Sequence, residues 1–258
     1  MKNKKQNRYL NILFVFVGIA ILLLIWEITS KLYNNNNIYP DVLVTLKSAF
    51  GLLSNGSTYI ALLTSLGICL LTMVIAFIFA LILGTLSGLF NSIDKILSPF
   101  IAIMKVVPTA VIAILLIIFV KSFYSTIIVI FLVVFPILYE SIVNGIHNVD
   151  KYIIMSLRIE GLYKWNSIFK VLIPQIMPYI YLGIVSSFGL SMKVEIMSEI
   201  IVGSVAVSGL GHLIYLSYAV NSDYIELFGL VLITLISFGI VDLILNFGRK
   251  TLKNKNIL

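Results

Sequence analysis

The chain has 258 residues, of which 18 are Lys or Arg and 11 are Asp or Glu, so that only 11% are charged. A typical soluble domain carries about 25% charged residues, whereas here 60% of the residues are hydrophobic and the mean hydropathy is +1.09. A soluble fold could not cover its surface with so few polar side chains. The composition therefore excludes a soluble globular protein and predicts an all-α polytopic membrane protein. The net charge of +7 is then expected to face cytoplasmic lipid head groups, not nucleic acid.

Long apolar runs predict six membrane-spanning helices within a single domain that covers residues 1–258. A span needs about 20 apolar residues, and the run over 60–90 is longer, so it is expected to tilt or to extend past the bilayer. The first run is read as an uncleaved helix, because no small-residue cleavage pattern follows it. The six helices are expected at about 10–32, 60–90, 99–120, 124–146, 176–198 and 223–247.

Two shorter features lie near the first spans. Pro40 and Asp41 are typical of a helix start, and they predict a short amphipathic helix over about 41–53. Gly84 and Gly88 form a small-x-x-x-small pair that permits close helix contact. The pair predicts a contact within the chain, with a contact between two subunits as the alternative.

The basic residues predict the orientation. With the N-terminus in the cytoplasm, 13 of the 18 Lys and Arg residues fall in cytoplasmic segments and three in external ones. The remaining two, Lys105 and Lys193, fall inside spans. Because basic residues concentrate in cytoplasmic loops, both termini are expected in the cytoplasm, with an even number of crossings.

The single cysteine and the two histidines limit the chemistry of the chain. Cys69 has no thiol partner, which excludes an intrachain disulfide and a cysteine-based zinc site. His147 and His212 are expected on opposite sides of the membrane, too far apart to share a metal ion. We therefore expect no catalytic residue, no metal and no cofactor.

The segment over about 148–175 is the only sizeable polar stretch between spans. Asp150 is expected to cap a helix that runs to 160, and Gly161 to break it in a left-handed conformation. A second helix is expected from near Trp165 to Ile173 and Pro174. A helix-turn-helix of this size suits docking on another protein, and a helix that lies on the lipid head groups is the alternative.

This segment resembles the permease signature of ABC importers. Gly161 lies thirteen residues before Pro174, with Arg158 before it and Trp165 between them. Residues 155–157, Met-Ser-Leu, stand where the family has Glu-Ala-Ala, so the leading carboxylate is missing. The resemblance runs from about residue 60 to 247 and is strongest with the nitrate, sulfonate, taurine and bicarbonate group, which also contains thiamine-precursor importers. Further matching motifs are Lys105 to Pro108, Phe135-Pro136, Gly145 to Asp150, Met192 to Ile200 and Ser208 to Gly211.

The resemblance implies a division of labour between subunits. Two permease copies would pair, each docking its 148–175 segment on a cytoplasmic ABC ATPase, while an external solute-binding protein delivers a small anionic, sulfonate-like or vitamin-precursor-like solute. Gly is nowhere followed by Lys, so the chain has no Walker-type phosphate loop and another subunit must hydrolyse ATP. The residues implied in coupling are Met155, Ser156, Leu157, Arg158, Gly161, Trp165 and Pro174.

Ionisable residues inside spans are candidates for the translocation pathway, because each costs about 3 kcal/mol or more at mid-bilayer. Glu195 and Glu199 are four residues apart and share a helix face, whereas Lys193 lies about 160° away from Glu195. Lys193 is expected either to pair with an acid on another helix or to face the pathway. Pro108 is a fourth candidate, as a gating kink or as ordinary packing. Lys105 is expected to extend its ammonium group to the interface, where Glu140 is also expected.

Two other classes of function, a stand-alone transporter and an intramembrane enzyme, predict sequence features that this chain lacks. A secondary transporter or channel that works alone predicts internal repeats, and the sequence has none. An intramembrane hydrolase predicts G-x-S-x-G, and a zinc protease predicts H-E-x-x-H. Both motifs are absent, so the sequence favours a transport subunit.

Overall fold

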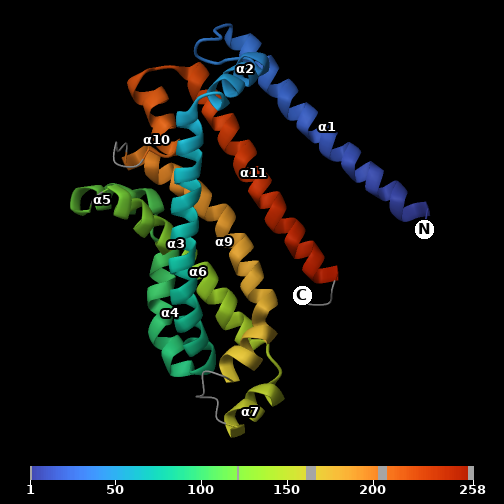
Figure 1. Cartoon of the computed structure of the whole chain (residues 1–258), viewed down its shortest axis with the longest axis vertical. Helices are drawn as coiled ribbons and strands as arrows, with labels where there is room; N and C mark the ends of the chain where they lie inside the picture. Colours follow the sequence, from blue (N-terminus) through green and yellow to red (C-terminus); the bar gives the residue numbers. More distant parts are fainter. Residues whose placement is uncertain (1, 121, 161–166, 203–207, 255–258) are drawn as a thin grey trace.

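The computed structural model describes residues 2–120, 122–160, 167–202 and 208–254. All regular structure in these ranges is helical (Figure 1). Five helices are long and apolar enough to cross a membrane, and a bent pair makes a sixth span if it is counted as one. The structure confirms the expected all-α polytopic membrane fold with about six spans.

Three long helices form the packed core of the molecule. They are α3 (Gly56–Leu89), α6 (Ser122–His147) and α9 (Ile173–Val202). The buried stripe of α3 consists mainly of small residues, which let the neighbouring backbones approach closely. A Cβ on Gly84 would lie 3.1 Å from Cβ of Ile142, and one on Gly88 would lie 2.7 Å from Cδ1 of Ile146. The Gly84 and Gly88 pair thus packs against α6 of the same chain, as the sequence predicts.

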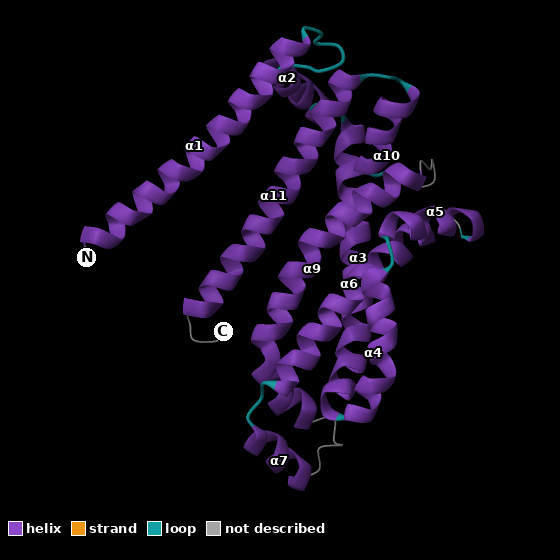
Figure 2. Cartoon of the chain, turned by 180° about the vertical axis from the view of Figure 1, so that it is seen from behind, coloured by secondary structure: helices purple, strands orange, loops and turns teal. Residues whose placement is uncertain are grey.

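The expected third span is two helices and not one. α4 (Asn91–Val106) and α5 (Thr109–Phe119) are bent by 95° at the break between them. Pro108 disfavours the helical conformation at the residue before it, and Val107 is extended, with φ −66° and ψ 127°. The prediction of one helix over 99–120 is therefore wrong in two respects. The observed helix begins earlier, at Asn91, and it ends at Val106, where the chain bends into α5. Figure 2 shows α5 projecting sideways from the bundle.

The first and last helices stand at the edge of the bundle. α1 (Lys2–Tyr33) and α11 (Tyr224–Asn254) both descend from the end of the molecule where α2 (Val42–Leu53) lies (Figure 1). Only 6% of the apolar window of α1 is buried. α2 packs on α11, where the hydroxyl of Ser48 donates to the carbonyl of Ile225 at 3.0 Å.

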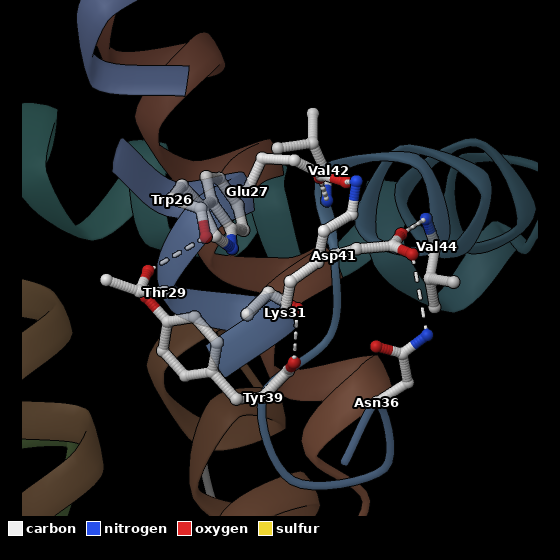
Figure 3. Close-up of polar contacts among 10 residues, drawn as sticks. Trp26, Glu27, Thr29, Lys31, Asn36, Tyr39, Asp41, Val42 and Val44 are labelled. Carbon is white, nitrogen blue, oxygen red and sulfur yellow. Dashed lines mark hydrogen bonds and ion pairs between the residues drawn. The ribbon is translucent and has the colours of Figure 1, made fainter. Parts of the chain in front are cut away.

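Polar contacts fix the corner between α1 and α2 (Figure 3). The indole of Trp26 donates to the carbonyl of Pro40 at 3.1 Å, and the amide of Val42 donates to Glu27 at 3.3 Å. Asp41 caps α2 by accepting from the amide of Val44 at 2.7 Å. The helix expected over about 41–53 is thus present, and a side-chain cap of the kind that usually starts helices fixes its first turn.

A short helical segment follows α9 in the chain. α10 (Leu210–Tyr215) continues into the π-helix η2 (Leu216–Val220), and together they are too short to span a bilayer. α10 packs on the far end of α9 and on α3. It therefore lies at the end of the bundle opposite the helix that follows α6.

Candidate functional site

The segment expected to couple to a partner begins with a capped helix. α7 (Lys151–Glu160) follows α6 after a tight turn, and Asp150 accepts from the amide of Tyr152 at 2.9 Å. α7 lies below the bundle helices, at the end of the molecule opposite α2 (Figure 2). Ile153 and Ile154 pack back onto the core, while Tyr152, Met155 and Ile159 are 80%, 62% and 80% exposed. One helix thus presents a second, uncovered apolar face outward.

The other residues implied in coupling have different placements. Ser156 is exposed and donates to the carbonyl of Tyr152 at 2.8 Å. Leu157 and Arg158 belong to α7, but their side chains lie outside the described part of the chain, as do Gly161 and Trp165 altogether.

Pro174 does not end a helix, in contrast to the expectation. The π-helix η1 (Ile168–Leu172) runs directly into α9, and Pro174 is the second residue of α9. A proline inside a continuous helix lacks the amide that would bond the preceding turn, and its ring clashes with the carbonyl there, so the backbone must adjust. The wide turn before it supplies the adjustment, since the amide of Ile173 donates to the carbonyl of Ile168.

A cavity of about 560 Å³ opens between α7 and the C-terminal ends of α3 and α6. Its walls are mostly apolar, with His147 and Lys151 among them. The lining residues are Gly88, Leu89, Ile146, His147, Val149, Lys151, Ile154, Met155 and Ile159. The exposed face of α7 is therefore continuous with this cavity through Met155 and Ile159.

The two glutamates expected inside the membrane form a buried pair near the C-terminal end of α9. Glu195 is 0% exposed and Glu199 is 3% exposed. Oε2 of Glu199 accepts from the amide of Gly211 at 2.8 Å and from the hydroxyl of Ser65 at 3.4 Å. Ser65 also accepts from the amide of Leu210 at 2.9 Å. The pair thus joins α9 to α3 and α10.

Lys193 and Pro108 lie apart from this pair. Lys193 is exposed, which agrees with its position on a different face of α9, and it forms no ion pair with the described residues. Pro108 is exposed at the break between α4 and α5. The structure therefore separates the four pathway candidates into a buried carboxyl pair and two exposed positions.

Sequence reasoning missed a second polar cluster, on α4 and α6. The ammonium group of Lys105 lies 2.7 Å from Oε1 of Glu140, and the hydroxyl of Tyr139 donates to Asp94 at 3.0 Å. These residues line a cavity of about 360 Å³. The available signal was the opposite charge of Lys105 and Glu140 on two neighbouring spans. The sequence analysis places both residues at the interface but does not pair them.

Comparison with known proteins identifies the family. Residues 76–255 match the model of the family described as "Binding-protein-dependent transport system inner membrane component". The nitrate import permease protein NrtB of Synechocystis is 28% identical over 89% of this chain and 84% of its own length. The bicarbonate transport system permease protein CmpB of Synechocystis is 27% identical over 94% of this chain and 88% of its own length.

The fold agrees with a solved transporter. A chain of the MetNI methionine ABC transporter, determined in inward-facing conformations, superposes with a TM-score of 0.59 at 15% identity, over 76% of this chain and 93% of that chain. The family match covers well over half of the chain, and the chain carries several apolar helices of spanning length. It therefore belongs to the binding-protein-dependent transport system inner membrane components, as a multi-pass permease subunit of an ABC importer.

Proposed function

We propose that two copies of this chain form the translocation pathway of an ABC importer for a small anion. A cytoplasmic ABC ATPase would drive the cycle and an external solute-binding protein would deliver the solute. The observation that carries the proposal is the uncovered apolar face of α7, formed by Tyr152, Met155 and Ile159. Exposed apolar side chains gathered on one short helix mark a protein contact.

The inner end of the bundle suits transmission of movement from that contact. Ile153 and Ile154 on the opposite side of α7 pack against the core, so a force on α7 would be transmitted to the packed bundle. No Gly-Lys step occurs in the sequence, which supports ATP binding by a separate subunit. Alternating access would follow when two such segments are drawn together.

The substrate class rests on the relatives and on Lys193. Two relatives are named as nitrate and bicarbonate permeases. Lys193 is exposed and lacks an ion pair among the described residues, whereas Lys105 is neutralised by Glu140. We infer that Lys193 faces the pathway between two copies, where an ammonium group favours an anion.

Uptake measurements test this function. Cells that express the chain with the ATPase and binding protein of its own source should accumulate labelled nitrate or bicarbonate, and Ile159→Asp should abolish uptake by placing a charge in the apolar docking face. Gly67→Ala, on α3 and away from this face, is the control and should leave uptake unchanged, because nothing lies within 4 Å of its Cβ position. Uptake that persists without the ATPase would instead support a secondary transporter.

A further inference from the structure

The carboxyl pair in α9 leaves three oxygens without partners. Among the described residues, no hydrogen-bond partner is present for either oxygen of Glu195 or for Oε1 of Glu199. All three atoms are buried, and the side chain of Glu195 lies beside Ser65, Glu199 and Cys69. Buried carboxylate oxygens without donors are costly. The pair is therefore incomplete with the described protein atoms alone.

Within the described ranges, the neighbouring elements place no Lys or Arg side chain beside the pair. α3 contributes Ser65 and Cys69, and α10 contributes the amides of Leu210 and Gly211 and the buried His212. From α6, Thr126 accepts from Ser198, one residue before Glu199, and from α5, Thr109 contacts Met197. On α9 itself, Ser191 lies beside Cys69, and Lys193 is exposed on another face.

The donor set around Glu199 argues against a metal ion. Glu199 receives an amide N–H and a hydroxyl, and Ser65 receives a second amide N–H. Hard cations need several oxygen ligands, whereas N–H groups point positive charge toward the site. These donors, at the start of α10, stabilise one negative charge on Glu199 and leave Glu195 next to it without a donor.

We propose that Glu195 and Glu199 together hold one proton, which sits on Glu195 and is donated to Oε1 of Glu199. One proton satisfies oxygens on both side chains and leaves the pair with the single negative charge that the amides of α10 can hold. Two buried carboxylates this close do not both ionise. The pair is thus a proton-binding site that fastens α10 to α9 and α3. This inference goes beyond the proposed transport function and does not depend on it.

The close approach of α10 links the protonation of the pair to the position of this helix. A Cβ on Gly209 would meet the carboxyl of Glu199, and one on Gly211 would lie 2.6 Å from the carbonyl oxygen of Ile196. The backbone of residues 209–211 therefore lies directly on the pair. Loss of the proton would leave two buried negative charges beneath this backbone, and α10 would move away from α9.

Infrared spectroscopy of the purified full-length chain in lipid nanodiscs tests the proposal. At neutral pH the wild type should show a protonated carboxylic C=O band that shifts in D2O and on labelling with ¹³C-glutamate. Glu195→Gln should remove this band and leave the carboxylate bands intact. Glu140→Gln is the matched control, since Glu140 is an ion-paired carboxylate, and it should reduce only a carboxylate band.

Two results would overturn the proposal. One is a Glu195→Gln spectrum that loses carboxylate intensity and keeps the protonated band. The other, which needs no variant, is a wild-type protonated band that does not move with ¹³C-glutamate. The rate at which N-ethylmaleimide labels Cys69, taken relative to the denatured chain, provides an independent readout. Glu195→Gln should leave the labelling rate of the buried thiol within about twofold of the wild-type rate. Glu199→Ala should raise the rate about tenfold, because α10 loses its hydrogen-bond acceptor. Equal labelling in the two variants would contradict the fastening role.

Discussion

Single residues decide how closely the backbone segments of this permease approach one another. The clearest case is Gly211, whose amide donates to Glu199 while its Cα faces the backbone of α9. In the sequence, the Ser-Gly-Leu-Gly motif at 208–211 stands out only by its resemblance to the permease family. Its carboxylate partner, a dozen residues earlier in the chain, became visible only in three dimensions, because hydropathy carries no information on which loop folds back onto which helix.

Gly211→Ala is expected to destabilise the protein. The new Cβ would lie 2.6 Å from both the carbonyl oxygen of Ile196 and Cβ of Glu199, so the backbone itself must shift. Overpacking of this kind costs about 1–3 kcal/mol, and thermal unfolding in detergent should show a lower midpoint. Gly67→Ala is the matched control, because nothing lies within 4 Å of its Cβ position, and it should be neutral or stabilising. Equal midpoints for the two variants would contradict the close approach of α10.

The Lys105 and Glu140 pair is expected to contribute little to stability. Its side chains are 52% and 42% exposed, and exposed pairs contribute less than about 1 kcal/mol. A double-mutant cycle with Lys105→Met and Glu140→Gln, followed by thermal unfolding, measures the coupling. A coupling of several kcal/mol would show that the cavity beside the pair is sealed from water in the assembled transporter.

At the scale of helices, the sequence predicts spans well and directions poorly. The apolar run over 99–120 is continuous, so hydropathy shows one helix where the structure has two at 95°. The proline was recognised as a possible kink, but the size of the bend depends on what holds α5. Ala113 on α5 is 0% exposed, and Thr109 contacts Met197 of α9. Tertiary packing therefore directs a helix that local sequence only interrupts.

Pro108→Ala tests which of these two causes sets the bend. Alanine restores the amide and lets Val107 become helical, so the bend should loosen toward a straight helix. Spin labels at the exposed Ile103 and Ile114 would report a broader distance distribution with a longer component. An unchanged, narrow distribution would assign the bend to packing of Ala113 alone.

The 148–175 segment shows the same division between local and distant causes. Asp150 and the start of α7 were predictable, because a capping side chain acts within two residues. The continuation of η1 into α9 was not, because a proline near an expected helix end and a proline in a first turn look identical in sequence. The exposure of Tyr152, Met155 and Ile159 also could not be predicted, because it depends on which side of α7 packs on the core. Ile153 and Ile154 form that side.

At the scale of the molecule, large apolar surfaces remain uncovered in the single chain. α1 is almost unburied, and on α5 Ile118 and Phe119 are 70% and 79% exposed. Lipid covers such surfaces in a membrane, and α5 projects sideways from the bundle (Figure 1). The family and number of spans could be predicted from the sequence, whereas these unpaired faces could not, since composition does not distinguish a lipid contact from a subunit contact.

The orientation is a prediction from charge, and both terminal helices extend away from the end of the molecule where α2 lies (Figure 1). We expect fluorescent-protein fusions at either end to fluoresce, because the positive-inside rule predicts both ends in the cytoplasm together with 13 of the 18 Lys and Arg residues. Accessibility of a cysteine introduced at the exposed Tyr218, in a Cys69→Ser background, should be external. Fluorescence from only one terminal fusion would contradict an even number of crossings.

Site-specific cross-linking tests the central claim, that the outward face of α7 docks on an ATPase. A photoreactive amino acid at Tyr152, Met155 or Ile159 should cross-link the chain to its ATPase subunit in native membranes. The same amino acid at Ile153 or Ile154, on the face of α7 that packs on the core, should not. Cross-links from the second pair and none from the first three positions would contradict the assignment of this helix as the coupling surface.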